Sequence, residues 1–202
     1  FRGRVPIKKP ESLKEVLRSA VARGLTEDAV SLKESIAEDL WEVPHDPHKL
    51  GIVFRNVAQN ALEAMPDGGV IVLETHVKTL DGNYCKIHNA MPGRYATISV
   101  KDNGMGIDGN HLKQVFDPFF TTKEMGRGTG LGLASAYGII KNHGGSIHVS
   151  SKKDKGSTFE IYLPASDTGS QKRAAPFEQI LRGTETLLLV DDEEMIIDVC
   201  KQ

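Results

Sequence analysis

The sequence has little cysteine, no long apolar run and almost no net charge. Its two cysteines, Cys85 and Cys200, are far apart among the 202 residues and form no pair with metal-ligand spacing. A disulfide framework is therefore not expected, and a reducing cytoplasmic environment fits best. The formal net charge of −2 gives no electrostatic reason to expect a nucleic-acid partner or a contact with a membrane surface. No stretch approaches the roughly 20 apolar residues of a membrane helix, and no signal-peptide pattern opens the chain.

The composition and the periodicity predict an ordinary globular α/β protein. Hydrophobic residues make up 39% of the chain and charged residues 26%. Apolar residues at helical spacing predict one helix that follows a capping box at residues 12–15 and another with Asp46 as N-cap and Pro47 in its first turn. The expected helices are 12–24, 47–65 and 133–143, and the expected strands are 70–73, 95–101, 147–149 and 159–163, with two short strands in 29–43 and a short helix near 111–115. Helices and strands alternate irregularly, which predicts an α/β sandwich with a mixed sheet.

One predicted helix carries a stripe of polar side chains beside its apolar face. Asn56, Asn60 and Glu63 share this stripe, because steps of four and three residues return to the same side of a helix. Amide oxygens are ligands that a hard cation such as Mg²⁺ accepts. Taken alone, however, the stripe favours a plainer interpretation, a solvated helix face that happens to carry asparagines.

A carboxylate ends an apolar strand row. Side chains alternate along the strand 95–101, so Asp102 falls on the same side as the apolar residues 96, 98 and 100. A carboxylate in such a place is costly unless it finds a donor, and the exocyclic amine of a purine would be one. Gly104 and Gly106 let the backbone turn and approach a flat ring closely. In isolation, a strand-end turn of the Asp-Asn-Gly type remains the better explanation.

The strongest single pattern is a glycine-rich run that leads into a helix. Residues 126–133 place four glycines at alternate positions, which exposes backbone N–H groups beside a helix N-terminus and favours phosphate oxygens. Lys123 and Arg127 add positive charge nearby. The run is not a Walker loop, because the Gly-Lys-Ser/Thr ending is missing, and no hydrophobic strand precedes it as in a dinucleotide fingerprint. A flexible glycine loop without a ligand is the weaker alternative.

Together and in this order, these elements resemble the catalytic, ATP-binding domain of sensor histidine kinases. The family's N, G1, F and G2 boxes resemble residues 56–64, 102–106, 116–123 and 128–133. The resemblance extends from about Glu11 to Pro164. It implies the Bergerat-type ATP-binding fold shared with gyrase, the Hsp90 chaperone and the mismatch-repair ATPases, in which a mixed β-sheet is layered on α-helices with ATP bound between them.

The resemblance also implies roles for individual residues. Asn60 would bind Mg²⁺ with weaker help from Asn56, and Glu63 would orient or deprotonate an incoming histidine. Asp102 would hold the adenine amine, with Thr158 helping through a water molecule. The other implied ATP-binding residues are Gly104 and Gly106 beside the base, the backbone amides of Gly130, Leu131 and Gly132 at the phosphates, and Lys123, Arg127, Gly128, Thr129 and Leu133 around them, with residues 116–129 forming a mobile lid.

The sequence suggests a domain of this type followed by the start of another. Residues 1–164 form the kinase-type domain, and residues 165–184 read as a linker rich in Ser, Gly, Pro and charge. Residues 185–202 resemble the first strand and acidic pair of a response-regulator receiver domain, although an amphipathic strand with an acidic end explains them too. An apolar strand of this kind tends to pair, so we expect docking on the ATPase domain or a homodimer through residues 185–202. The chain is expected to be a piece of a longer hybrid kinase.

The expected function is transfer of the ATP γ-phosphoryl group to a histidine on a separate dimerisation domain. None of the seven histidines is followed by Asp or Glu, so the acceptor is expected on a domain that precedes Phe1. Most of these histidines are expected in loops or on the surface. The expected partners are that dimerisation domain and a receiver domain, and the location is cytoplasmic, whether or not the parent protein has a membrane anchor.

Two other functions stay open. A hydrolytic ATPase of the gyrase and chaperone branch would carry a glutamate base one turn before the Mg²⁺-binding asparagine, but here that position is Asn56, whose amide cannot take a proton from water. A module that senses ATP or ADP without catalysis is the second alternative. All four boxes are intact, which argues against a degenerate site.

Overall fold

A computed structural model describes residues 9–24, 29–38, 40, 43–81, 91–123 and 128–165. All of them belong to one compact unit that spans Phe1–Ser170, and a second unit comprises Gln171–Gln202. The predicted linker beyond residue 165 and the receiver-like strand in residues 185–202 therefore lie outside the described residues.

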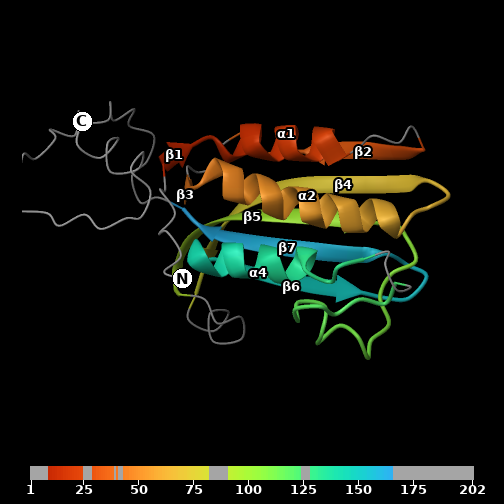
Figure 1. Ribbon diagram of the computed structural model, residues 1–202. Helices are drawn as coiled ribbons and strands as arrows, with labels where there is room; N and C mark the ends of the chain where they lie inside the picture. Colours follow the sequence, from red (N-terminus) through yellow and green to blue (C-terminus); the bar gives the residue numbers. More distant parts are fainter. Residues whose placement is uncertain are drawn as a thin grey trace, which may run out of the picture. The chain divides into compact units, whose positions relative to one another are not determined.

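Helices cover one face of a mixed five-stranded sheet, as predicted (Figure 1). The sheet has the strand order β2-β4-β5-β7-β6, in which β2 is parallel to β4 and all other neighbours are antiparallel. A separate two-stranded sheet pairs β1 with β3. In chain order the elements are β1 (Lys9–Glu11), α1 (Leu13–Gly24), β2 (Val30–Ser35), β3 (Val43–His45), α2 (Pro47–Glu63), β4 (Gly69–Leu80), β5 (Gly93–Asp102), α4 (Gly132–Asn142), β6 (Ser146–Ser151) and β7 (Ser157–Pro164).

The core lies between the helices and the sheet. Helix α2 begins with Pro47 and is capped by Asp46, whose Oδ1 accepts a hydrogen bond from Lys49 N at 3.2 Å. Its apolar face packs into the same cluster as α1, α4 and the inward side chains of the strands. The buried residues of α2 are Leu50, Val53, Phe54, Val57, Ala58, Ala61 and Leu62. The polar stripe therefore runs beside a face that is fixed by burial.

Two histidines are part of the interior rather than the surface. His143 is 3% exposed; its Nε2 accepts a hydrogen bond from Asp46 N at 3.1 Å, and its Nδ1 lies 2.8 Å from Ile139 O. This arrangement ties the end of α4 to the start of α2. His45 is completely buried in β3. The expectation that most of the histidines lie in loops or on the surface does not extend to burial of these two, whose rings each have a backbone partner.

Strand β1 was not predicted, β5 and β6 are longer than predicted, and two larger differences concern β4 and residues 111–115. Strand β4 continues to Leu80, well beyond residue 73, because its second half pairs with β5 along the whole ladder. Near residues 111–115 the chain forms successive turns instead of a short helix, with His111 N bonded to Asp108 O and Gln114 N bonded to His111 O, both at 2.9 Å. Each of these bonds spans three residues, as in an isolated turn.

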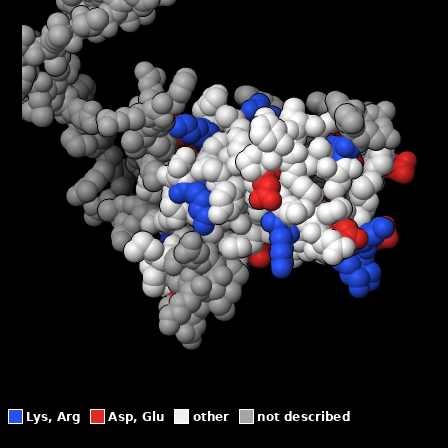
Figure 2. Space-filling model, turned by 60° about the horizontal axis from the view of Figure 1, so that its bottom comes forward, with Lys and Arg blue, Asp and Glu red and all other residues white. Residues whose placement is uncertain are grey.

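Charges are mixed on the surface. On the face shown in Figure 2, basic and acidic side chains are scattered among uncharged ones, and the described part of this face has no broad patch of one sign. The pattern agrees with the small net charge of the whole chain.

Candidate nucleotide site

The predicted motifs meet in one cleft of about 850 Å³. Helix α2 and the start of α4 form part of its wall, and the end of β5 and the start of β7 form another part. Segments 120–123 and 128–130 complete the wall. The sequence-predicted residues that line it are Asn56, Asn60, Glu63, Asp102, Gly106, Lys123, Gly128, Thr129, Gly130, Gly132 and Leu133. The volume is in the range of cavities that hold small ligands and cofactors.

The two stripe asparagines are held by hydrogen bonds through their amide nitrogens. Asn56 Nδ2 donates to Gly132 O at 2.9 Å, and Asn60 Nδ2 donates to Asn56 O at 2.8 Å. Each nitrogen thus bonds to a backbone carbonyl, so each side-chain oxygen is left as the acceptor atom of a residue that lines the cleft. The bond to Gly132 also connects α2 to the first residue of α4.

Asp102 is a buried carboxylate at the end of β5, as its strand register predicted. It is 2% exposed, and its Oδ1 accepts hydrogen bonds from Gly104 N at 2.9 Å and from Ser157 N at 3.2 Å. Burial raises the pKa of the Asp102 carboxyl above its usual range, and the two backbone donors oppose that shift. The charged form of this group is therefore costly at this position, and a further donor would stabilise it.

Gly104 has no room for a side chain. A Cβ there would lie 2.4 Å from Ala64 O, which belongs to the cap of α2. The next residue, Met105, donates its backbone N–H to the same Ala64 oxygen at 2.9 Å. The missing side chain lets the segment after β5 lie against the end of α2, which fixes Asp102 relative to the asparagine stripe.

Gly130 plays a similar part in the glycine loop. Its φ of +64° and the 2.4 Å between a Cβ there and the Phe119 carbonyl carbon both require glycine. Phe119 N donates to Gly130 O at 3.0 Å, so the F box is bonded to the glycine loop. The Phe119 side chain itself is 74% exposed.

Four predicted site residues are not among the described residues that line the cleft. Gly104 is one of them, because its backbone packs against Ala64 O. Thr158 does not belong to the lining; it is paired with Lys101 on the outer side of the sheet, and its neighbour Ser157 faces Asp102 instead. Leu131 is 43% exposed and not part of the lining, with its backbone N 3.4 Å from Thr129 Oγ1. Arg127 lies outside the described residues.

The sequence prediction also missed several residues of the cleft. Ser157 could have been found, because residues 159, 161 and 163 alternate as buried positions and put residue 157 on the same side of β7. The apolar lining residues had no such signal, because they come from turns and from separate strands. Lining residues that fell inside the predicted boxes without a role of their own are Gln59, Ala64, Met105, Phe120, Thr121 and Thr122, and those outside the boxes are Ile107, Val115, Ser157 and Phe159.

An ion pair connects two sides of the cleft. Lys123 Nζ pairs with Glu63 Oε2, and the other carboxylate oxygen of Glu63 accepts from Gln59 Nε2 at 3.2 Å. Both charged side chains are 36% exposed, so the pair is solvated at the edge of the cleft. Lys123 is the one basic residue among the described residues of the lining.

The donor set fits a magnesium ion that is shared with phosphate. Among the described residues, no group of three His, Cys, Asp or Glu side chains could hold a metal by itself. Mg²⁺ is commonly bound by one or two protein oxygens together with substrate phosphates and water. The side-chain oxygens of Asn56 and Asn60 meet that description without a dedicated protein cage.

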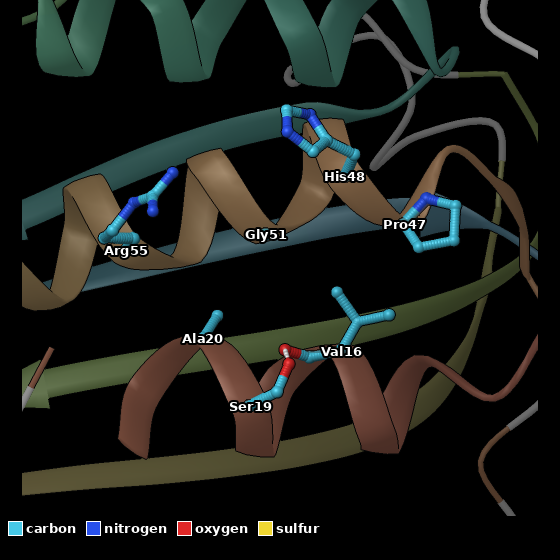
Figure 3. Close-up of a pocket in the computed structure, with 7 residues that line it drawn as sticks. All are labelled: Val16, Ser19, Ala20, Pro47, His48, Gly51 and Arg55. Carbon is cyan, nitrogen blue, oxygen red and sulfur yellow. Dashed lines mark hydrogen bonds between the residues drawn. The ribbon is translucent and has the colours of Figure 1, made fainter. Parts of the chain in front are cut away.

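A second, smaller hollow of about 290 Å³ lies between α1 and α2. Figure 3 shows that Val16 and Ala20 point from α1 toward α2. The Ser19 hydroxyl donates back to Val16 O at 3.1 Å, and Gly51 leaves open space on α2. The hollow is thus explained by two packed helices with a small residue between them, and the predicted motifs are all elsewhere.

Comparison with known proteins agrees with this geometry. Residues 45–167, more than half of the chain, match the model of the histidine kinase-, DNA gyrase B-, and HSP90-like ATPases. The sensor kinase CckA of Brucella abortus is 40% identical over 190 residues, which cover 89% of this chain and 20% of that protein. Sporulation kinase E of Bacillus subtilis is 38% identical over 144 residues, 71% of this chain and 18% of that protein. The mycobacterial sensor histidine kinase MprB has a structure with a TM-score of 0.63 at 26% identity, covering 79% of this chain and 98% of that one.

The chain therefore belongs to the histidine kinase-, DNA gyrase B- and HSP90-like ATPase family. Within that family it is an ATP-binding catalytic domain of the two-component sensor histidine kinase type, with the Bergerat fold. It spans about a fifth of the length of the curated relatives named above. In the described part of the chain, no helix combines the length and apolar character needed to cross a membrane.

Proposed function

We propose that this domain transfers the γ-phosphoryl group of ATP to a histidine on a separate, dimerising domain. The observation that carries the proposal is the chemistry of the stripe on α2. The position one turn before Asn60 holds Asn56, an amide that is already bonded to Gly132 O, and not a carboxylate that could activate water. Of the described residues that line the cleft, only Glu63 and Asp102 carry carboxylates.

Neither carboxylate is suited to act as a base for water. Asp102 is buried at the end of β5, where two backbone N–H groups bond to its Oδ1. Glu63 is paired with Lys123 and lies one turn beyond Asn60, on the other side from the base position of the hydrolytic branch. An imidazole nitrogen brought in by a partner is itself the nucleophile, so it needs positioning more than activation.

We assign adenine recognition to Asp102. Its carboxylate would accept a hydrogen bond from the exocyclic amine, which would add a donor to the two backbone N–H groups and offset part of the cost of burial. Ser157, rather than Thr158, would assist beside it. Gly104 and Gly106 allow the backbone to pass close to the base.

We assign the phosphates to the start of α4 and to Lys123. The backbone N–H groups at Gly130, Leu131 and Gly132 precede or begin this helix, where partial positive charge favours anions. Asn60, helped by Asn56, would hold a Mg²⁺ ion, which neutralises charge on the phosphate oxygens. In the transfer the bond from the γ-phosphorus to the bridging oxygen breaks, a bond to one imidazole nitrogen forms, and ADP leaves with that oxygen.

The partner would dock beside the mouth of the cleft. Phe119, Leu131 and Tyr137 are large apolar residues with 74%, 43% and 40% exposure. Phe119 lies in the F box, Leu131 caps α4 and Tyr137 lies in α4. Exposed apolar side chains close to a site favour a protein partner there. A receiver domain, and a homodimer through residues 185–202, are further proposals on residues outside the described part of the chain.

The test uses ATP labelled in the γ-phosphate and the purified acceptor domain of the parent protein. The expected result is prompt labelling of the acceptor histidine and very slow release of phosphate when the acceptor is left out. An acceptor whose histidine is replaced by glutamine is the control and should stay unlabelled. Brisk phosphate release without acceptor would move the domain to the hydrolytic branch, and nucleotide binding without either reaction would favour a sensing module.

A further inference from the structure

The single basic side chain among the described residues of the cleft already has an anionic partner. Lys123 pairs with Glu63, the last residue of α2, although the two are 60 positions apart in the sequence. The contact bridges α2 and the segment 120–123, both of which line the cleft. A polyphosphate that enters would therefore meet a lysine whose charge is already paired.

The surroundings hold both partners in place. Gln59 Nε2 donates to Glu63 Oε1 one helical turn away, which orients the carboxylate. On the other side, Lys123 N donates to Thr121 Oγ1 at 3.2 Å, and the aliphatic stem of Lys123 passes Gly128, where a Cβ would come within 3.1 Å of Lys123 Cδ. These contacts flank the Lys123 stem, and its ammonium group pairs with Glu63 at the edge of the cleft.

The pair is also weak enough to be exchanged. Both side chains are about a third exposed, and ion pairs of that kind are screened by water and salt. Phosphate oxygens carry more negative charge than one carboxylate and form stronger charge-assisted hydrogen bonds with an ammonium group. A triphosphate can therefore replace Glu63 as the partner of Lys123, whereas a nucleoside monophosphate brings much less charge.

We propose that Glu63 is a positioning residue that pairs with Lys123 at the edge of the cleft and competes with the nucleotide's phosphates for it. This rests on the proposed function, because it requires a polyphosphate in this cleft. Glu63 acts through Lys123 and sets how strongly the domain prefers a triphosphate to a monophosphate. Removing its charge frees Lys123 and should sharpen that preference.

The experiment is a calorimetric titration of the chain with Mg²⁺-ATP and with AMP at two salt concentrations. Glu63→Gln keeps the size of the side chain and should lower the Kd for ATP by about two- to fivefold, the range of an exposed ion pair, with little change for AMP. Lys123→Gln should weaken ATP binding by at least about tenfold, and Lys123→Arg should recover most of that loss. Glu160→Gln is the control: it removes one negative charge from β7, outside the cleft lining, and should leave the Kd of both ATP and AMP unchanged.

The double variant Glu63→Gln/Lys123→Gln decides whether Glu63 acts through the lysine. Competition predicts that Glu63→Gln loses most of its effect once Lys123 is gone. If Glu63→Gln has the same effect in both backgrounds, Glu63 repels phosphates directly and the inference is wrong. If ATP binds but Glu63→Gln has the same Kd for ATP as the unmodified chain, the pair is an ordinary surface contact and the inference is wrong. Failure of both ATP and AMP to bind would instead contradict the proposed function.

Discussion

Replacing Asp102 by Asn tests the adenine assignment with almost no change of shape. The amide has one acceptor and one donor group, whereas the carboxylate has two acceptors. If the amide oxygen accepts from Gly104 N and Ser157 N, the NH₂ group faces the adenine amine, so that two donors meet. If the amide is turned round, the NH₂ group faces the two backbone N–H groups instead, and donors again meet. Either way one hydrogen bond to a charged acceptor is lost, which is worth about 1.5–3 kcal/mol. That loss corresponds to a Kd for ATP, ADP and adenosine raised by about 10- to 150-fold.

In the absence of nucleotide, the same substitution should not destabilise the protein near neutral pH. Burial raises the pKa of Asp102 in the folded state, so the folded protein binds this proton more tightly than the unfolded chain does. Protonated Asp102 therefore contributes stability that is fully present below the pKa of the unfolded chain. This contribution is lost as pH rises through the pKa of Asp102 in the folded protein. Relative to the Asp102→Asn variant, the unmodified chain should become less stable from acid toward neutral pH.

Two assays measure these effects separately. Calorimetric titration gives the Kd for ATP, ADP and adenosine, and denaturant unfolding at several pH values gives the stability of both proteins. The expected combination is a large loss of affinity, similar for all three ligands, with unchanged or higher stability near pH 7. Near-unchanged affinity would refute adenine recognition by Asp102. An affinity loss that accompanies a fall in stability would mean that the variant damages the fold instead.

Three further substitutions test other parts of the structure. His143→Phe removes the acceptor for Asp46 N and should lower the free energy of unfolding by about 1–3 kcal/mol, measured in urea, with the Kd for ATP unchanged for the protein that remains folded. Asn60→Ala should weaken ATP binding in the presence of Mg²⁺ but hardly in EDTA; equal effects in both would argue against a metal ligand. Gly104→Ala places a Cβ 2.4 Å from Ala64 O and should lower both the thermal midpoint and ATP affinity, while Gly51→Ala, in open space on α2, serves as the tolerated control.

Much of the fold followed from local sequence patterns. The spacing of apolar residues predicted α2 and α4, and the alternation along 95–101 placed Asp102 on the buried side of β5, as the structure confirms. The glycines of the G1 and G2 boxes were singled out from sequence, and the contacts at Gly104 and Gly130 give their physical reason. The bounds of β4 were predicted too short, because the pairing with β5 extends the strand beyond its most apolar residues.

The sequence by itself determined the family, the main helices and the order of the motifs, because these depend on short-range periodicity and on residues close together in the chain. Only the tertiary structure decided which distant residues meet. The ion pair of Lys123 with Glu63 spans 60 positions, and the hydrogen bond of Asp46 with His143 spans 97. Such contacts depend on how α2, α4 and the sheet pack against one another, and no local pattern encodes that packing.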